Sequence, residues 1–128
     1  MKKHGLAAFL FTTVLTFQAQ AASYIGASTG TTNGAAGVIA MSALCNATFA
    51  GARMCTYEEI ALTVHKSAKS HGPAWVQPLD SSGHPVPTVC AGLGSGGGIS
   101  ALVVDGKGRW NAGAGALCDS VLPVSCCK

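Results

Sequence analysis

The six cysteines constrain the fold of this chain more than any other feature. An even number of cysteines in a chain of only 128 residues is typical of a disulfide framework. A zinc site is the weaker alternative, because the chain has no Cys-x-x-Cys pair and no cysteine at ligand spacing from a histidine. We therefore predict three disulfide bonds and an oxidising compartment. The cysteines are Cys45, Cys55, Cys90, Cys118, Cys126 and Cys127.

The first 21 residues have the pattern of a secretory signal peptide. A short basic segment at residues 2–4 precedes an apolar run at residues 6–17, and Ala19-Gln20-Ala21 follows as a small-residue cleavage motif. The apolar run is much shorter than the ~20 residues that a membrane-spanning helix needs. We expect cleavage near Ala21, with a cut after Ala22 as the alternative. The expected location is secreted or periplasmic in a bacterium, with no stable membrane span after cleavage.

The remaining chain is small and nearly uncharged. Removing 21 of the 128 residues leaves 107, which suits one small domain. The formal charge of the whole chain is +3, and two of its lysines belong to the leader, so +1 remains. Such a chain has no basic face for several phosphates, and we do not expect nucleic acid as a partner.

The segment before the first expected helix contains small and polar residues. Tyr24-Ile25 favours a strand, and the Thr- and Gly-rich stretch that follows, up to residue 37, is interpreted as a loop or linker. In residues 38–49, Val38, Met41, Cys45 and Phe49 recur at helical spacing. This pattern predicts a helix with Cys45 on its inner face, capped near Asn33.

A second helix is predicted from Thr56. Thr56 and Glu59 have the spacing of a capping box, and Glu58 adds negative charge at the helix start. Gly72-Pro73 is the expected stop, after an apolar face that includes Ile60. Both glutamates are interpreted as capping residues and not as catalytic acids.

The second half of the chain reads mainly as strands. Residues 74–76 predict a short buried strand, and residues 79–98 a long loop held by Cys90. Residues 99–104 predict a strand, and Asp105-Gly106 is a strong hairpin signal before a partner strand at residues 109–111.

The end of the chain combines a glycine-rich stretch with a strand. Residues 112–116 are interpreted as a bend, and residues 121–127 as the last strand. Neighbouring residues of a strand point to opposite faces of the sheet. Cys126 and Cys127 are therefore expected to take different partners.

The histidines and cysteines of the mature chain form no catalytic motif. His65, His71 and His84 lack the spacing of three or four that would place two ligands on one helix face. The motif His-Glu-x-x-His is absent. Fully paired cysteines would leave no thiolate nucleophile. We expect no enzyme activity and no cofactor.

The order of these motifs resembles the C-type-lectin-like domain. Cys45 followed by Gly51-Ala52-Arg53-Met54 is similar to the family's first-helix cysteine and the strand after it, and residues 56–60 are similar to the start of its second helix. The Trp75 strand, Trp110-Asn111, Cys118 and the final Pro123–Cys126 segment are similar to later family elements. The match covers about residues 38–127, and the chain also resembles uncharacterised secreted bacterial cysteine-rich members of this family.

The resemblance implies a fold and a disulfide pattern. The fold would be α+β, with two helices packed on a small, mainly antiparallel twisted sheet and a long loop region, all cross-linked by disulfides. The domain would span residues 38–128, after an N-terminal strand and loop at residues 22–37. Cys90 would pair with Cys118, and Cys45 and Cys55 with Cys126 and Cys127 in an order that the resemblance leaves open.

The resemblance does not extend to calcium. Calcium needs six to eight oxygen ligands, and family members that bind sugar through calcium carry Glu-Pro-Asn or Gln-Pro-Asp in the long loop and Trp-Asn-Asp in the hairpin. Here Ala112 follows Trp110-Asn111, and residues 81–98 contain no acid. We expect no metal site of that kind.

Three functions remain. The first is a non-catalytic, calcium-independent binding module for an unknown protein or glycan, and the alternative is a structural envelope or cell-surface protein without a small ligand. A small hydrolase or inhibitor is the third. The expected ligand surface combines the 79–98 loop with residues 105–116, where an exposed Trp110 would supply contact area, although core packing of this residue is the competing interpretation. Its residues are Asp105, Lys107, Arg109, Trp110 and Asn111.

Overall fold

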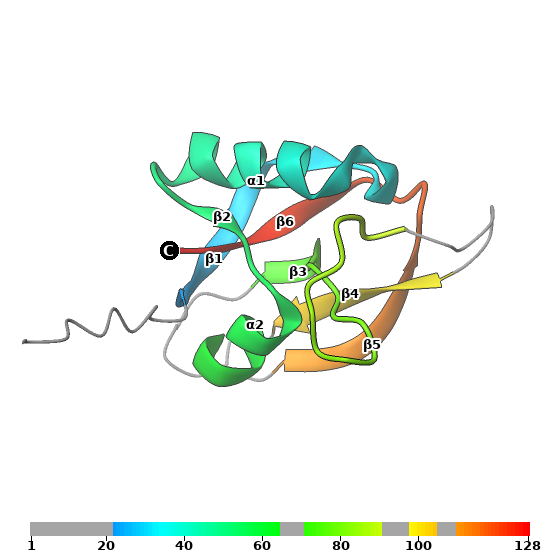
Figure 1. Ribbon diagram of the computed structural model, residues 1–128. Coiled ribbons are helices and arrows are strands. Elements are labelled where there is room, and N and C mark those ends of the chain that lie inside the picture. The colour runs from blue at the N-terminus through cyan, green and yellow to red at the C-terminus, as the bar shows by residue number, and fades with distance from the viewer. Residues whose placement is uncertain (1–21, 65–70, 91–97, 105–109) are drawn as a thin grey trace, which may run out of the picture.

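The computed structural model describes residues 22–64, 71–90, 98–104 and 110–128, with only the backbone described at residues 71, 98–104 and 110–115. The described chain forms an α+β fold, as expected, with strands between two helices (Figure 1). The elements are β1 (Tyr24–Thr32), η1 (Gly34–Ala36), α1 (Gly37–Thr48), β2 (Arg53–Met54), α2 (Tyr57–Thr63), β3 (His71–Trp75), β4 (Gly98–Val104), β5 (Trp110–Leu117) and β6 (Leu122–Cys127).

Strand β6 lies inside the sheet, although it comes last in the sequence. The strand order is β1-β6-β3-β4-β5, and β2 also pairs with β6. Every strand pair described is antiparallel except β3 with β6, where Trp75 pairs with Val124. The last strand of the sequence therefore lies between β1 and β3, which come much earlier in the chain.

Two of the three disulfides join β6 to α1 and to the segment just before α2. Cys126 is bonded to Cys45 of α1, and its neighbour Cys127 is bonded to Cys55, just before α2. The expectation that the adjacent cysteines take different partners is confirmed. The third disulfide joins Cys90 to Cys118, as the resemblance implies.

A first hydrophobic core lies between α1 and the sheet. Met41 and Cys45 of α1 pack there with Trp75, Val124 and other buried residues. The indole Nε1 of Trp75 donates to the carbonyl of Thr32 at 2.8 Å, so this buried polar group has a partner. The predicted helix at residues 38–49 is confirmed, and the buried side of α1 carries Cys45 as expected.

A second, smaller core lies between α2 and the opposite side of β6. Its buried residues include Ile60 of α2 and Val64 just after it, with Tyr24 and Cys127 from the sheet. The predicted capping box is confirmed: Thr56 Oγ1 accepts from the Glu59 amide at 3.2 Å, and Glu59 Oε2 accepts from the Thr56 amide at 2.9 Å. The sequence therefore marks the start of α2 correctly.

Two local predictions are wrong. Residues 26–32 continue strand β1, which pairs with β6 through Thr32, and do not form a loop. Residues 112–116 belong to strand β5, which pairs with β4, and do not form a bend. Pairing through the backbone needs no large side chain, so small residues can form strands there.

Two further corrections concern helix ends. Gly72-Pro73 lies in β3 and does not stop a helix. A register shift between His71 and Ala74 accommodates the proline, which has no N–H to donate to the ladder. Asn33 caps the short η1, where its Oδ1 accepts from the Ala35 amide at 3.2 Å, and α1 itself has no side-chain cap.

Several predictions fall on positions outside the described residues. They are the signal peptide at residues 1–21, the end of the second helix at residues 65–70, the glycine run at residues 91–97 and the hairpin turn at residues 105–108. Within the described part of the chain, no helix combines the length and the apolar character needed to cross a membrane.

Candidate functional site

The predicted ligand surface is only partly within the described structure. Asp105, Lys107 and Arg109 lie outside the described residues. Trp110 and Asn111 begin β5, where Trp110 pairs with Val104 and Asn111 with Val103 of β4. The described structure thus confirms that β4 and the predicted partner strand pair with each other. The side chain of Trp110 is not described.

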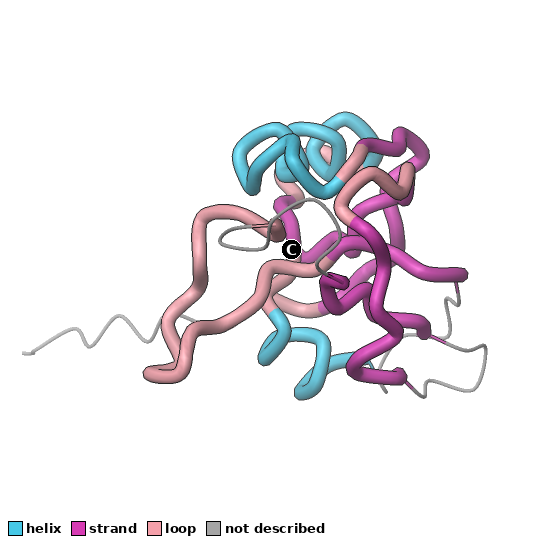
Figure 2. The backbone as a smooth tube through the Cα atoms, turned by 90° about the vertical axis from the view of Figure 1, so that its right-hand side faces the viewer, coloured by secondary structure: helices cyan, strands magenta, loops and turns pink. Residues whose placement is uncertain are grey.

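The best-defined surface feature is the loop of residues 77–87. Leu79 and Pro85 form an antiparallel bridge, and the Asp80 amide donates to the His84 carbonyl at 2.8 Å. Asp80 Oδ1 in turn accepts from the amides of Ser82 and His84 at 2.8 and 2.9 Å. The loop is therefore internally bonded, and it stands away from the strands in Figure 2.

Hydrogen bonds connect the base of this loop to both helical regions. The Gln77 amide donates to the Cys55 carbonyl at 2.9 Å, and the Tyr57 amide donates to the Gln77 carbonyl at 2.9 Å. At the other end, the Val38 amide at the start of α1 donates to the Pro87 carbonyl at 3.2 Å. The loop thus bridges the start of α2 and the start of α1.

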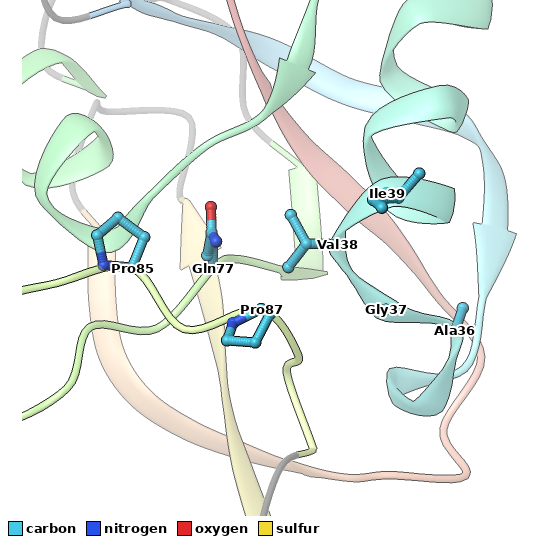
Figure 3. Close-up of a pocket in the computed structure, with 7 residues that line it drawn as sticks. All are labelled: Ala36, Gly37, Val38, Ile39, Gln77, Pro85 and Pro87. Atoms are coloured by element: carbon cyan, nitrogen blue, oxygen red, sulfur yellow. The ribbon is translucent and has the colours of Figure 1, made fainter.

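An open, mostly apolar pocket of about 410 Å³ lies between this loop and the start of α1. In Figure 3, Val38 extends from α1 toward Gln77 and Pro87. Gln77 Nε2 donates to the Val86 carbonyl at 2.8 Å, which fixes the amide at the pocket wall. We call this pocket the α1–loop pocket; its lining residues are Ala36, Gly37, Val38, Ile39, Gln77, Pro85 and Pro87.

An exposed isoleucine stands at the edge of the α1–loop pocket. Ile39 is 90% exposed, the most exposed large hydrophobic residue of the described chain. A second pocket, of about 330 Å³, is lined by Tyr57, Val76, Pro78 and Leu79 on the α2 side of the loop. Apolar surface therefore occurs next to the loop on two sides.

No charged side chain is among the described residues that line the α1–loop pocket. At the loop tip, His84 Nδ1 is 3.7 Å from Asp80 Oδ2. Arg53 forms an ion pair with Glu59 near the start of α2. Burial opposes the charge on Glu59, but the hydrogen bonds from Arg53 and Thr56 outweigh this effect and lower the Glu59 pKa.

The α1–loop pocket is lined mainly by apolar groups. None of the described residues that line it is an acid, a base or a nucleophile. Among the described residues, no group of three His, Cys, Asp or Glu side chains is placed to hold a metal ion. The pocket offers apolar contact and backbone groups, which can take an apolar side chain of a partner.

Sequence patterns point to only one of the two elements that form this pocket. The long loop at residues 79–98 is part of the predicted ligand surface. The start of α1 lies about 40 residues earlier, and no local pattern connects it with Pro85 or Pro87. A search of family models, of curated proteins and of solved structures finds no match to this chain.

Proposed function

We propose that this protein is a secreted or periplasmic binding module of bacterial origin that has no catalytic activity. It takes its partner without calcium, and the partner is a protein or a glycan. The α1–loop pocket carries the proposal. Its apolar walls and the exposed Ile39 favour an apolar side chain of a protein partner over a sugar, because none of the described lining residues is an aromatic ring on which a sugar could stack.

The element order supports the C-type-lectin-like assignment within this proposal. A cysteine-bearing helix, a capped second helix and a Trp-containing strand precede the long loop, and a strand pair and a final cysteine-bearing strand follow it. The disulfide from Cys90 to Cys118 ties the end of the loop to the turn after β5. Such a cross-linked scaffold presents a loop at low entropic cost, which favours binding.

A structural role in the cell envelope is the second candidate. One observation favours it: the 12 residues of α1 include no charged side chain, and the exposed side of this helix carries Ile39 with several alanines. An uncharged helix face suits permanent contact with a neighbouring subunit better than it suits solvent.

A binding screen tests the first candidate. The oxidised protein is probed against glycan arrays and purified bacterial surface proteins, with and without a chelator. We expect binding to a protein that is unchanged by the chelator. Binding that the chelator abolishes would contradict the calcium-independent mechanism, and a uniformly negative screen with stable self-association would favour the structural role.

Ile39→Asp then locates the contact. A central apolar contact replaced by a charge costs about 2 kcal/mol, so we expect a roughly 30-fold weaker Kd by surface plasmon resonance. Leu62→Asp is the matched control, because Leu62 is 54% exposed on α2, at the other end of the molecule in Figures 1 and 2. Equal losses in both variants would remove the α1–loop pocket from the proposal.

A further inference from the structure

The carboxylate of Glu59 accepts hydrogen bonds from three different residues. Oε2 accepts from Arg53 Nη1 and from the Thr56 amide, each at 2.9 Å. Oε1 accepts from Arg53 Nη2 and from the backbone nitrogen of Ala22, the latter at 3.3 Å. The Thr56 bond completes the capping box and the Arg53 bonds form an ion pair, but neither role explains a contact with a residue 37 positions earlier.

Ala22 stands at the point where the paired backbone begins. The next residue, Ser23, exchanges two hydrogen bonds of 3.0 Å with Lys128. The Tyr24 amide then donates to Thr63 Oγ1 at 2.9 Å. Three successive backbone nitrogens are thus held by the folded domain, and the first of them is held by a charged carboxylate and not by a neutral oxygen.

We propose that the chain is cut between Ala21 and Ala22, and that Glu59 binds the α-ammonium group of Ala22 that the cut creates. The inference rests on the proposed export of the protein. Hydrolysis adds one water across the peptide bond, so that Ala21 keeps the new carboxylate and the Ala22 nitrogen becomes a protonated amine. The amide nitrogen of Ala22 in the structure stands in for this ammonium.

The geometry supports an ammonium at this place. The side chain of Glu59 is only 9% exposed, so water screens its charge weakly, whereas Arg53 is 47% exposed and its repulsion of a second cation is screened more strongly. Converting a neutral donor into a charged one makes a hydrogen bond to a carboxylate roughly twice as strong. Cleavage therefore strengthens a contact that the uncut chain already has.

The contact also distinguishes the two cleavage sites that the sequence left open. A cut after Ala22 would remove the nitrogen that Glu59 binds. The new terminus would then be Ser23, whose nitrogen faces the carbonyl of Lys128. Only a cut after Ala21 gives the buried carboxylate a positively charged partner at the terminus.

The first test determines the N-terminus of the natural product. The full chain is expressed in a bacterium, and the periplasmic and secreted fractions are analysed by intact mass and N-terminal sequencing. We expect Ala22 as the first residue. A first residue of Ser23 would overturn this inference and leave export intact, whereas uncut, reduced protein confined to the cytoplasm would overturn export as well.

The second test measures the ion pair independently of export. The sheet, both cores and all three disulfides lie within residues 22–128, so the processed chain keeps the complete described fold. Oxidised protein starting with a free Ala22 is compared in urea with protein that carries one extra glycine before Ala22. We expect the extension to raise the unfolding equilibrium constant about fivefold, as for a partly buried ion pair.

Variants of the two neighbouring glutamates complete the test. In Glu59→Gln the extension should have almost no effect, because the charged acceptor is gone. In Glu58→Gln, the matched control on the exposed side of the same turn, the fivefold effect should persist. An equal extension effect in Glu59→Gln and in the wild type would overturn the ion pair. If Glu59→Gln does not fold, acetylation of Ala22 in the wild-type protein should reproduce the fivefold loss, and no loss would likewise overturn it.

Discussion

The helices on the two sides of strand β6 are held in place by different kinds of contact. On one side, α1 has 12 residues, no charged side chain and no side-chain cap, and it is held by a large apolar core with Trp75. On the other side, α2 has seven residues, and a capping box and an ion pair supplement a smaller core. A short helix buries too little surface to be stable by packing alone, so polar contacts contribute more there.

Removing either of the two disulfides that close long loops tests whether the α1 side and the α2 side contribute equally to stability through their links to β6. We compare Cys45→Ala/Cys126→Ala with Cys55→Ala/Cys127→Ala. The bonds close loops with sequence separations of 81 and 72. In the chain-entropy model each bond stabilises by about 4.5 kcal/mol, with almost no difference between them.

Urea unfolding of both double variants checks this equality. A loss that is clearly larger on one side would show that the native contacts of that side, and not loop closure, decide the outcome. The pair Cys90→Ala/Cys118→Ala serves as a reference, with a separation of 28 and an expected loss of about 3.6 kcal/mol.

Core truncation should separate the two sides next. Trp75→Ala is expected to lower the free energy of unfolding by about 4 kcal/mol, because it empties a large volume and leaves the Thr32 carbonyl without its indole donor. Ile60→Ala in the smaller core should cost about 3 kcal/mol. Thermal and urea unfolding measure both, and a larger loss for Ile60→Ala would reverse the assignment of the major core.

Acid should destabilise the α2 side selectively, and this is the smallest of the expected effects. The folded pKa of Glu59 is lowered, so its contribution is complete above the unfolded value of about 4.3 and is lost as the pH falls through the lower folded value. Glu59→Gln should cost about 1.5 kcal/mol at neutral pH, a modest figure because Arg53 is half exposed.

The acid dependence of this variant gives the decisive measurement. As the pH falls below about 5, the wild type should lose stability relative to Glu59→Gln, and the two unfolding curves should converge. Thr56→Ala removes the cap hydrogen bond without removing the charge, at a cost of about 1 kcal/mol. This control should keep the wild-type acid slope, and parallel slopes in all three proteins would contradict the role of the Glu59 charge.

Local chemistry made one part of the fold predictable. The capping box at Thr56, the helical spacing around Cys45 and the opposite faces of Cys126 and Cys127 each depend on a few neighbouring residues. Residues 26–32 and 112–116 are predicted as a loop and a bend because small residues such as glycine and threonine fit loop patterns equally well. Only the partner strand, β6 for β1 and β4 for β5, makes them strands, and a partner is not a local property.

The candidate site was predictable to a lesser degree. The long loop with its prolines indicated an interaction surface, but the α1–loop pocket needs the start of α1 beside Pro87, which is a tertiary contact. Gly72-Pro73 illustrates the same limit. Both residues are common helix stops, yet a register shift in β3 admits them to the sheet.

The adjacent cysteines of β6 also have a consequence for biosynthesis. In the proposed export, Cys45 and Cys55 would leave the translocation channel long before Cys126 and Cys127, because their native partners lie 81 and 72 residues later. An oxidase that joins cysteines in order of appearance would first link Cys45 to Cys55. Reaching the native pairs would then require thiol–disulfide exchange, so we expect maturation of this protein to depend on a disulfide isomerase.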